Sequence, residues 1–299
     1  MCASIVIKNK ARRSGYVALL GRTNVGKSTF LNALMQTKVA IVSNKPQTTR
    51  KRILAIKTCE RGQIIFFDCP GIHKPHFKLN VLMMKEVHDA LLDADLILYF
   101  IDIAYPAEDE FVISLLEKAG KKVFLVINKI DKLNKGKVLD KIQHDKDLFP
   151  WQEIVPISAV RGDNLALLED LIFNYLPEGD NFFPDDEYTQ QTEHFFIGEL
   201  IREKMLNWVE DELPFTTTIK IEEIKDRGEL VYVRAEIYVE TRAQKKIVIG
   251  KNGNMIKQIG QQARLTLEEY YGKKVFLDLF VKIVPGWRNS HQVLQEIFQ

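Results

Sequence analysis

The stretch GRTNVGKST, Gly21–Thr29, constrains the fold more than any other part of the sequence. It fits the pattern Gly-x-x-x-x-Gly-Lys-Ser and stands between an apolar run, Tyr16–Leu20, and a helix-like stretch, Thr29–Leu34. In this strand–loop–helix setting, main-chain N–H groups converge on a chain of phosphates, and the helix N-terminus adds a partial positive charge. The sequence therefore predicts a phosphate-binding loop at the end of a buried strand.

Short apolar runs alternate with amphipathic helical stretches through the first half of the chain. Buried strands that alternate with helices predict an α/β domain with a mostly parallel sheet and helices on both faces. The run Ile53–Thr58 is expected to pair antiparallel with Gln63–Phe67 at one edge. The expected strands are Tyr16–Leu20, Gln63–Phe67, Leu96–Ile101, Lys122–Ile127 and Glu153–Ile157, and the expected helices are Lys27–Met35, Val81–Leu92, Glu108–Ala119 and Leu165–Leu176.

The pattern changes after Leu176. The segment PEGDNFFPDDEYTQQTEH combines Pro, Gly, Asn and acidic residues, which is typical of a linker. Beyond it we expect a helix, two strands, a glycine-bearing turn, a helix, a strand and a short helix, which is an α+β order. A chain of 299 residues can form two domains, each with its own core. We expect a first domain over residues 1–180, a linker over 181–191 and a second domain over 192–299.

Composition and charge narrow the functional classes. The formal net charge is only +2, so affinity for nucleic acid must come from local clustering of charge. Three cysteines are too few for a disulfide framework or a zinc site, which suits a reducing cytosol. No apolar run approaches the roughly 20 residues that span a bilayer, and the first residues, MCASIVIKNKARR, do not resemble a secretory signal. We therefore expect a cytoplasmic protein.

A second motif, Asp68-Cys-Pro-Gly71, directly follows an expected strand. An aspartate at a strand end can hold Mg²⁺ through water, and the glycine N–H can meet a γ-phosphate, so such a loop would sense that phosphate. Lys27 would reach the β- and γ-phosphates, and the Ser28 hydroxyl would bind Mg²⁺. Asp-x-x-Gly alone is an ordinary turn. Together with the phosphate loop it predicts a nucleoside triphosphate site.

A third motif, Asn128-Lys-Ile-Asp131, follows the strand Lys122–Ile127 and selects the base. Its aspartate can accept two hydrogen bonds, from guanine N1–H and from the 2-amino group. Adenine lacks this donor pair, and a buried carboxylate without partners is costly. Lys129 would pack its stem along the base, and Ser158-Ala159 fits the loop whose N–H meets the guanine oxygen. Guanine is therefore favoured over adenine.

The segment Pro46-Gln-Thr-Thr-Arg50 offers two adjacent threonines. Thr49 is our first choice for the switch residue that closes over Mg²⁺ and the γ-phosphate, and Thr48 is the second. Because spacing in such segments is loose, both could instead be threonines at the start of a strand.

A basic stretch in the second domain indicates RNA. Residues Thr241–Arg264 hold six basic side chains and no Asp or Glu. Within them, Gly250-Lys-Asn-Gly253 lies between an apolar run and a helix, which is typical of the loop with which a KH domain clamps about four unpaired nucleotides. A solvated helix face is the plain alternative. The expected RNA-binding residues are Arg242, Lys245, Lys246, Ile249, Gly250, Lys251, Asn252, Gly253 and Lys257.

Taken together, these motifs resemble the Era family of bacterial ribosome-assembly GTPases. The matching segments are GRTNVGKST, QTTR, DCPGI, NKID and ISAVRGDNL, followed by RAQKKIVIGKNGNMIKQIG and VKIVPGWR, so the resemblance spans nearly all of residues 15–290. It implies a P-loop GTPase domain and a KH domain of the bacterial type, GTP or GDP with Mg²⁺ as ligands, and hydrolysis of GTP to GDP and phosphate.

The resemblance also implies partners. They are the unpaired 3′ end of small-subunit ribosomal RNA and the 30S subunit during its maturation. We expect a monomer in the cytoplasm and allow for peripheral association with the cytoplasmic face of the inner membrane. Two alternatives stay open: a membrane-associated or signalling GTPase whose second domain binds protein, and an RNA chaperone with a structural nucleotide.

Two positions depart from Ras-like enzymes. Ile72 follows the Asp-x-x-Gly motif where a glutamine could orient the attacking water, so slow unassisted turnover is expected. Asn24 stands where some relatives hold K⁺, although a loop asparagine that tolerates an unusual backbone angle would look the same. The candidate catalytic residues are Lys27, Thr49 and Asn24; the metal ligands are Ser28, Thr49 and Asp68; and the nucleotide-binding residues are Gly21, Arg22, Thr23, Asn24, Val25, Gly26, Lys27, Ser28, Thr29, Asp68, Pro70, Gly71, Ile72, Asn128, Lys129, Ile130, Asp131, Ser158 and Ala159.

Overall fold

The computed structural model describes residues 11–73, 76–105, 107 and 109–298, which form two compact units. The first unit takes in the chain up to Val39, then Ile53–Cys69 and His88–Gln190. The second takes in Ala40–Arg52, Pro70–Val87 and the chain from Gln191 onwards. Most of the stretch that we inspected for a secretory signal, residues 1–10, lies outside the described residues.

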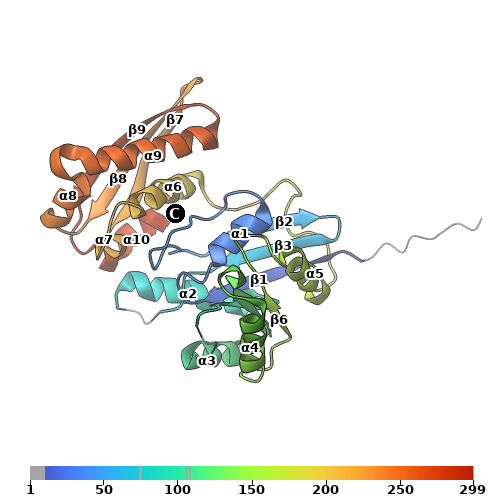
Figure 1. The fold of residues 1–299 in the computed structure, drawn as a ribbon. Helices are drawn as coiled ribbons and strands as arrows, with labels where there is room; N and C mark the ends of the chain where they lie inside the picture. Colours follow the sequence, from blue (N-terminus) through green and yellow to red (C-terminus); the bar gives the residue numbers. More distant parts are fainter. Residues whose placement is uncertain (1–10, 74–75, 106, 108, 299) are drawn as a thin grey trace, which may run out of the picture. The chain divides into compact units, whose positions relative to one another are not determined.

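The first unit is built on a six-stranded sheet with the order β2-β3-β1-β4-β5-β6 (Figure 1). All neighbouring pairs are parallel except β2 with β3, which confirms the predicted antiparallel edge pair. The strands are β1 (Arg13–Gly21), β2 (Ile53–Cys59), β3 (Gly62–Asp68), β4 (Leu96–Asp102), β5 (Lys122–Asn128) and β6 (Glu153–Pro156).

Helices connect these strands, as the alternating pattern predicted. They are α1 (Lys27–Met35), α2 (Lys78–Asp93), α3 (Glu110–Ala119), α4 (Lys135–Asp145) and α5 (Leu165–Tyr175). The helix α4 was not predicted, because charged and polar residues dominate it and only Val138, Leu139 and Ile142 are apolar. Its start is set instead by Asn134, whose side chain accepts the N–H of Lys137 at 3.0 Å.

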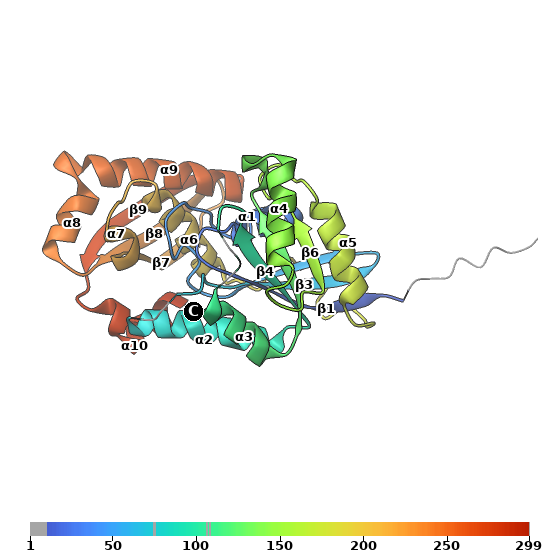
Figure 2. The ribbon, with the colours of Figure 1, turned by 60° about the horizontal axis from the view of Figure 1, so that its bottom comes forward.

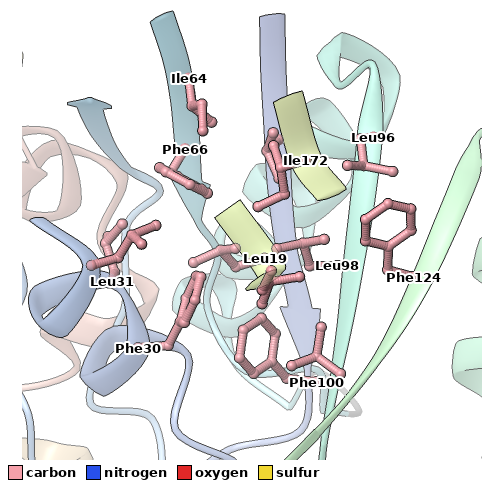
Figure 3. Packing of buried hydrophobic residues seen from close by; sticks show 14 of the residues in the cluster. Leu19, Phe30, Leu31, Ile64, Phe66, Leu96, Leu98, Phe100, Phe124 and Ile172 are labelled. Carbon is pink, nitrogen blue, oxygen red and sulfur yellow. The ribbon is translucent and has the colours of Figure 1, made fainter. Parts of the chain in front are cut away.

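The core of the first unit lies between the sheet and the helices α1 and α5. Figure 3 shows Leu19, Phe66 and Leu98 from three neighbouring strands in one layer with Phe30 of α1 and Ile172 of α5. Residues on the other side of the same strands are also buried, among them Leu20, Ile97 and Ile101. Strands buried on both faces require helices on both faces, which is the predicted α/β class.

The carboxyl ends of the central strands come together at one edge of this sheet. Gly21 pairs with Phe100 across β1 and β4, and Asp102 pairs with Asn128 across β4 and β5. Asp68, the last residue of β3, pairs with Leu19 of β1. The predicted phosphate loop and the base motif are therefore carried by neighbouring strands of one rigid sheet.

The second unit holds a three-stranded sheet with the order β7-β8-β9, where β7 and β8 are antiparallel and β8 and β9 are parallel. The helices α6 and α9 pack against it (Figure 2). The strands are β7 (Thr218–Asp226), β8 (Leu230–Val239) and β9 (Lys274–Ile283), and the helices are α6 (Glu193–Leu206), α7 (Leu213–Thr216), α8 (Arg242–Ile249), α9 (Asn254–Tyr271) and α10 (His291–Phe298).

Part of the second unit comes from the first half of the sequence. Leu79 and Met83 of α2 pack with Trp287 and Leu294 in one buried cluster. Trp287 is fully buried and its indole Nε1 donates to the Thr216 carbonyl at 2.9 Å, whereas Trp208 is 37% exposed. No helix among the described residues is long and apolar enough to cross a membrane.

Candidate functional site

The phosphate loop runs from the end of β1 to the start of α1 and depends on two glycines. Gly21 has φ +148°, and a Cβ there would lie 2.4 Å from the Phe100 carbonyl oxygen. Gly26 has φ +98°, and a Cβ there would lie 2.3 Å from Asn128 Nδ2. Any side chain at either position would therefore displace β4 or the base motif.

Lys27 lies at the base of this loop. Its Nζ donates to the main-chain carbonyls of Gly21 and Arg22, both at 3.1 Å. Burial lowers the pKa of this ammonium, and the charge of Asp68 opposes that shift. The side chain is thus held inside the curve of the loop, on the side to which the main-chain N–H groups of a phosphate loop converge.

Asp68 and Ser28 form the second polar pair of the loop. Ser28 Oγ donates to Asp68 Oδ2 at 2.6 Å, and both residues lie in the first unit. Asp68 is fully buried, and burial raises its pKa to about 6 against the opposing effects of Lys27 and Ser28. Its other oxygen, Oδ1, is buried without a hydrogen-bond partner among the described residues. A buried carboxylate oxygen of this kind is suited to a cation or a cation-bound water.

Asn128 ties the base motif to the phosphate loop. Its Nδ2 donates to the Val25 carbonyl at 2.8 Å, and its Oδ1 accepts the N–H groups of Lys129 at 2.8 Å and Ala159 at 3.1 Å. Asn128 is buried, with 1% of its surface exposed. One side chain therefore fixes the 21–29, 128–131 and 158–159 loops relative to one another.

The remaining base-motif residues converge on the same place. Asp131 Oδ1 accepts the Ser158 hydroxyl at 2.6 Å, and the main-chain N–H of Ile130 donates to Ile157. Lys129 has φ +67° and donates through Nζ to the Asn24 carbonyl at 2.6 Å and to Asp102 Oδ2 at 2.7 Å. Asp102 was not among the predicted site residues, because it only marks the end of an apolar run in the sequence.

Asn24 adopts the unusual backbone angle that we considered as its plain role. Its φ is +63°, in the left-handed region that asparagine tolerates better than most residues. Its carbonyl accepts the Lys129 ammonium. These observations account for an asparagine at position 24 by backbone geometry and leave a cation-binding role as a separate proposal.

The predicted switch residues belong to the second unit. Thr49 is 8% exposed, and Ile72 is 1% exposed in the segment that also holds Pro70 and Gly71. The hydroxyl of Thr48 donates to the Lys45 carbonyl at 2.6 Å, within its own turn. The Thr48 hydroxyl is thus used within its own turn.

Arg50, next to Thr49, holds this segment against α7 and its surroundings. Its guanidinium donates from Nη1 to the Thr217 carbonyl at 2.8 Å and from Nη2 to the Pro214 carbonyl at 2.6 Å, and it lies 5.8 Å from the Trp287 ring centre. Arg50 is 4% exposed, and burial together with the charge of Arg202 lowers its pKa to about 9. Its Nε is buried without a partner among the described residues.

Two residues of α6 hold the same segment. Arg202, 1% exposed, donates to the Thr48 carbonyl and pairs with Glu199 at 2.6 Å. Glu203 Oε1 accepts the Val42 N–H at 3.0 Å. The contacts through which Arg50, Arg202 and Glu203 hold this segment were not predicted, because the partners lie about 150 residues or more apart along the chain and no local motif marks such pairs.

The Gly250–Gly253 turn lies between α8 and α9, inside the connection that joins the parallel strands β8 and β9. Gly250 has φ +74°, and a Cβ there would lie 2.7 Å from Met255 Cβ. Asn252 also has a positive φ, of 53°, and α8 begins with a capping box between Thr241 and Gln244. The turn is therefore a strained, defined loop held between two helices.

The predicted RNA contacts surround this turn. Arg242, Lys246, Lys251, Asn252 and Lys257 are exposed, and Lys245, Gly250 and Gly253 are partly so. Ile249 is half-buried and packs, with Leu277 and Leu279 of β9, against the core of the unit. The structure thus places the basic side chains on the surface around a glycine loop whose flanks are apolar.

Two family models match the chain. A model described as "50S ribosome-binding GTPase" covers residues 16–129, which include the phosphate loop, the Asp68 motif and the start of the base motif. A KH-domain model covers residues 212–288, which include the Gly250–Gly253 turn. The residues Asp131, Ser158 and Ala159 lie outside both matched ranges.

Relatives match over almost the whole chain. A "GTPase Era" of Thermoanaerobacter sp. (strain X514) is 45% identical over 289 residues, covering 95% of this chain and 96% of the relative. A "GTPase Era" of Caldanaerobacter subterraneus subsp. tengcongensis is 46% identical over 96% of this chain and 98% of its own length.

Two solved structures are similar throughout. One is Era in complex with MgGDPNP and nucleotides 1506–1542 of 16S ribosomal RNA, with a TM-score of 0.92 and 40% identity. The other is an Aquifex aeolicus Era variant bound to GDP·AlF₄⁻, with a TM-score of 0.91 and 40% identity. Each match covers 96% of this chain and 98% of the other.

Proposed function

The chain belongs to the Era family of GTPases, and from that premise we propose that it is a GTP-driven switch that binds the single-stranded 3′ end of small-subunit ribosomal RNA. In this role it assists maturation of the 30S subunit. The support is a nucleotide site whose polar groups are organised on one sheet edge, a KH unit with a basic glycine loop, and likeness to an Era structure that contains 16S ribosomal RNA.

We assign the nucleotide contacts to the residues predicted from the sequence. The N–H groups of Arg22–Thr29 cradle the phosphates at the N-terminus of α1, and Lys27 carries positive charge to the β- and γ-phosphates. Asp131 recognises the guanine N1–H and 2-amino group, with Ala159 N–H near the guanine oxygen. Because Asn128 already fixes these loops relative to one another, less conformational entropy is lost when the nucleotide binds.

The polar residues fit a magnesium ion. Ser28 Oγ and the orphaned Asp68 Oδ1 supply oxygen atoms, and no group of three or more His, Cys, Asp or Glu side chains that could hold a metal occurs among the described residues. Mg²⁺ usually takes few protein ligands and completes its shell with phosphate oxygens and water. When bound, it neutralises the charge that develops on the phosphates during hydrolysis. Thr49 is the proposed further ligand.

The position after the Asp-x-x-Gly motif, where a glutamine could orient the hydrolytic water, is held by Ile72. Ile72 is apolar and buried, so it cannot orient water. We propose that main-chain groups of the Gly71 and Thr49 segments position the water when GTP orders them. K⁺ beside Asn24 is a further proposal, and comparison of turnover in K⁺ and Na⁺ at equal ionic strength tests it.

One observation carries the proposed coupling between nucleotide and RNA. The segments Ala40–Arg52 and Pro70–Val87, which hold Thr49 and Gly71, pack with the KH elements in one compact unit. Among the residues that the structure describes, Arg50 Nε and Arg202 Nη1 are buried without hydrogen-bond partners, so this packing carries an electrostatic cost. We propose that a γ-phosphate which orders Thr49 and Gly71 alters this packing within the second unit.

Affinity for single-stranded RNA in the two nucleotide states tests this function. We expect an RNA of the 16S 3′-terminal sequence to bind more tightly to the protein with a non-hydrolysable GTP analogue than with GDP. Equal affinities in both states would contradict the switch. RNA binding that depends on neither nucleotide nor the glycine loop would favour a chaperone or a protein-binding role instead.

The remaining assignments are consistent with this function. We propose a cytoplasmic monomer, with a GTPase domain over residues 1–180, a linker over 181–191 and a KH domain over 192–299. Peripheral association with the inner membrane stays a lesser proposal, and vesicle co-sedimentation in the two nucleotide states tests it.

A further inference from the structure

Asp102 ends β4 and faces the base motif. Its Oδ2 accepts the Lys129 ammonium at 2.7 Å, and its Oδ1 accepts the Ala104 N–H at 3.0 Å. The carboxylate is 8% exposed, and the ion pair with Lys129 lies at the rim of a cavity of about 500 Å³. Both carboxylate oxygens are therefore in use, and the carboxylate is fixed relative to the end of the strand.

Lys129 needs such a fixed partner. Its φ of +67° lies where side-chain-bearing residues are rarely found, so its conformation must be held by contacts. Its flexible stem has four CH₂ groups, and an unbound ammonium would sample many rotamers. The ammonium is instead held between Asp102 Oδ2 and the Asn24 carbonyl, which lies 2.6 Å from Nζ.

We propose that Asp102 is a positioning residue for nucleotide binding. It holds the Lys129 ammonium against the Asn24 carbonyl. The aliphatic stem of Lys129 then has a fixed position, against which the guanine ring can pack. The same contact ties the base motif to the phosphate loop, in parallel with the bond from Asn128 to Val25. This inference rests on the proposed placement of guanine beside Lys129 and Asp131.

A purely local role for Asp102 would be to cap its own turn through Ala104 N–H. An asparagine can accept that N–H equally well, because its amide oxygen has the same place and reach. Only the attraction for the Lys129 cation requires a charged carboxylate. Asp102→Asn therefore separates the two roles and keeps the size of the side chain.

Asp109 provides a matched control in the same cavity wall. Its carboxylate pairs with Arg22 and caps α3 by accepting the Val112 N–H, and none of its contacts among the described residues involves Lys129. Asparagine caps helices as well as aspartate does. Asp109→Asn thus removes one negative charge from the same cavity and leaves the Lys129 contact in place.

Release of N-methylanthraniloyl-GDP from the full chain tests the proposal. We expect Asp102→Asn to speed release about tenfold, which corresponds to about 1.4 kcal/mol, and Lys129→Met to speed it at least as much. The variant with both changes should release no faster than Lys129→Met alone, because Asp102 acts through Lys129. The Asp109→Asn variant should release N-methylanthraniloyl-GDP at the wild-type rate.

Three outcomes would overturn the inference. Release from Asp102→Asn at the wild-type rate would show that the charge does not matter. An undiminished effect of Asp102→Asn in the Lys129→Met background would show that Asp102 acts on its own turn. A wild-type rate for Lys129→Met would instead contradict the proposed base site, so failure of the site and failure of the inference give different results.

Discussion

The guanidinium of Arg50 donates a 2.8 Å hydrogen bond to the main-chain carbonyl of Thr217. The two residues are separated by 167 positions in the sequence, and both are buried. Through this bond, the residue next to the proposed switch threonine is held by the loop between α7 and β7 of the KH unit. A change in the backbone at Thr49 therefore acts directly on a KH element.

Replacing this arginine should weaken both stability and coupling. In Arg50→Lys, a single ammonium cannot reproduce the planar fork that serves two carbonyls and lies against Trp287. We expect a loss of about 2 kcal/mol in the free energy of unfolding, measured by denaturant titration. The ratio of RNA affinities in the GTP-analogue and GDP states should also move toward one. Arg52→Lys is the control, because Arg52 pairs with Glu86 at 3.7 Å near the surface; an equal effect there would contradict a special role for Arg50.

The glycine loop should be needed for RNA and dispensable for hydrolysis. Lys251→Asp with Asn252→Asp reverses the charge of the turn, and aspartate tolerates the positive φ at position 252. We expect RNA affinity to fall by at least about tenfold with turnover of GTP unchanged, measured by filter binding and phosphate release. Asn134→Asp with Lys135→Asp makes the same charge change at the exposed start of α4. A similar loss of RNA binding in that control would mean that net charge alone is responsible.

Base choice should be reversible at Asp131. In Asp131→Asn, the amide NH₂ would face the guanine donors, while xanthine offers an oxygen at the same place. We expect GTP affinity to fall by about 100-fold or more and xanthosine triphosphate to become the better ligand, measured by competition for a fluorescent nucleotide. The Ser158 hydroxyl can donate to the amide oxygen as it does to the carboxylate. Unchanged preference for GTP would place the base elsewhere.

The contact between Asp102 and Lys129 should have a defined pH range. Burial favours a higher pKa for Asp102. Hydrogen bonds from Lys129 and from the Ala104 N–H, together with the charges of Lys129 and Lys132, outweigh the effect of burial, so the pKa of Asp102 is lowered from its ordinary value of 3.8. A carboxylate whose pKa is lower in the folded state than in the unfolded state adds stability at pH values above its unfolded-state pKa. That contribution is lost as the pH falls through the folded-state pKa. The difference in Tm between wild type and Asp102→Asn should therefore be constant from about pH 5.5 to 8 and shrink below about pH 4. A difference that grows toward low pH would contradict the ion pair.

Hydrolysis should depend on Lys27. In Lys27→Ala, the phosphate loop loses a buried cation that contacts the loop carbonyls of Gly21 and Arg22. We expect turnover to fall by at least about 100-fold, measured by single-turnover phosphate release. Retention of RNA binding in this variant would show that the KH unit is intact. Undiminished turnover would favour a site elsewhere, with the nucleotide at this loop as a structural ligand.

The nucleotide site was predictable because its chemistry is local in sequence. Gly26, Asn128 and Asp131 each sit in short motifs whose spacing follows from strand ends and turns, and the structure brings them together by pairing neighbouring strands. Their roles in binding stay predictions. Asp102 could not be identified in the same way, because its partner Lys129 follows a different strand, β5, and an aspartate after an apolar run usually only ends a strand.

The contacts of the switch segments were not predictable from sequence. In the sequence, Arg50 is a charged residue after two threonines. Its role in holding the segment follows only from its burial and from its hydrogen bonds to the carbonyls of Pro214 and Thr217. The helix α4 was missed for a different reason: it has few apolar residues among its charged and polar ones, and capping by Asn134 sets its start. Long-range pairing and capping are the two sources of order that hydrophobic periodicity does not report.

The division of the chain into two compact units falls at 39/40, 52/53, 69/70, 87/88 and 190/191, so the polypeptide passes from one to the other five times. A protease that cut within residues 181–191 would sever only one of these passages. The carboxyl-terminal fragment would then stay attached without a peptide bond, because Arg50 donates to its carbonyls at Pro214 and Thr217. Leu79 and Met83 would also still pack against Trp287. In such a molecule the nick would separate nothing: the two pieces would still migrate together on a native gel and come apart only in detergent.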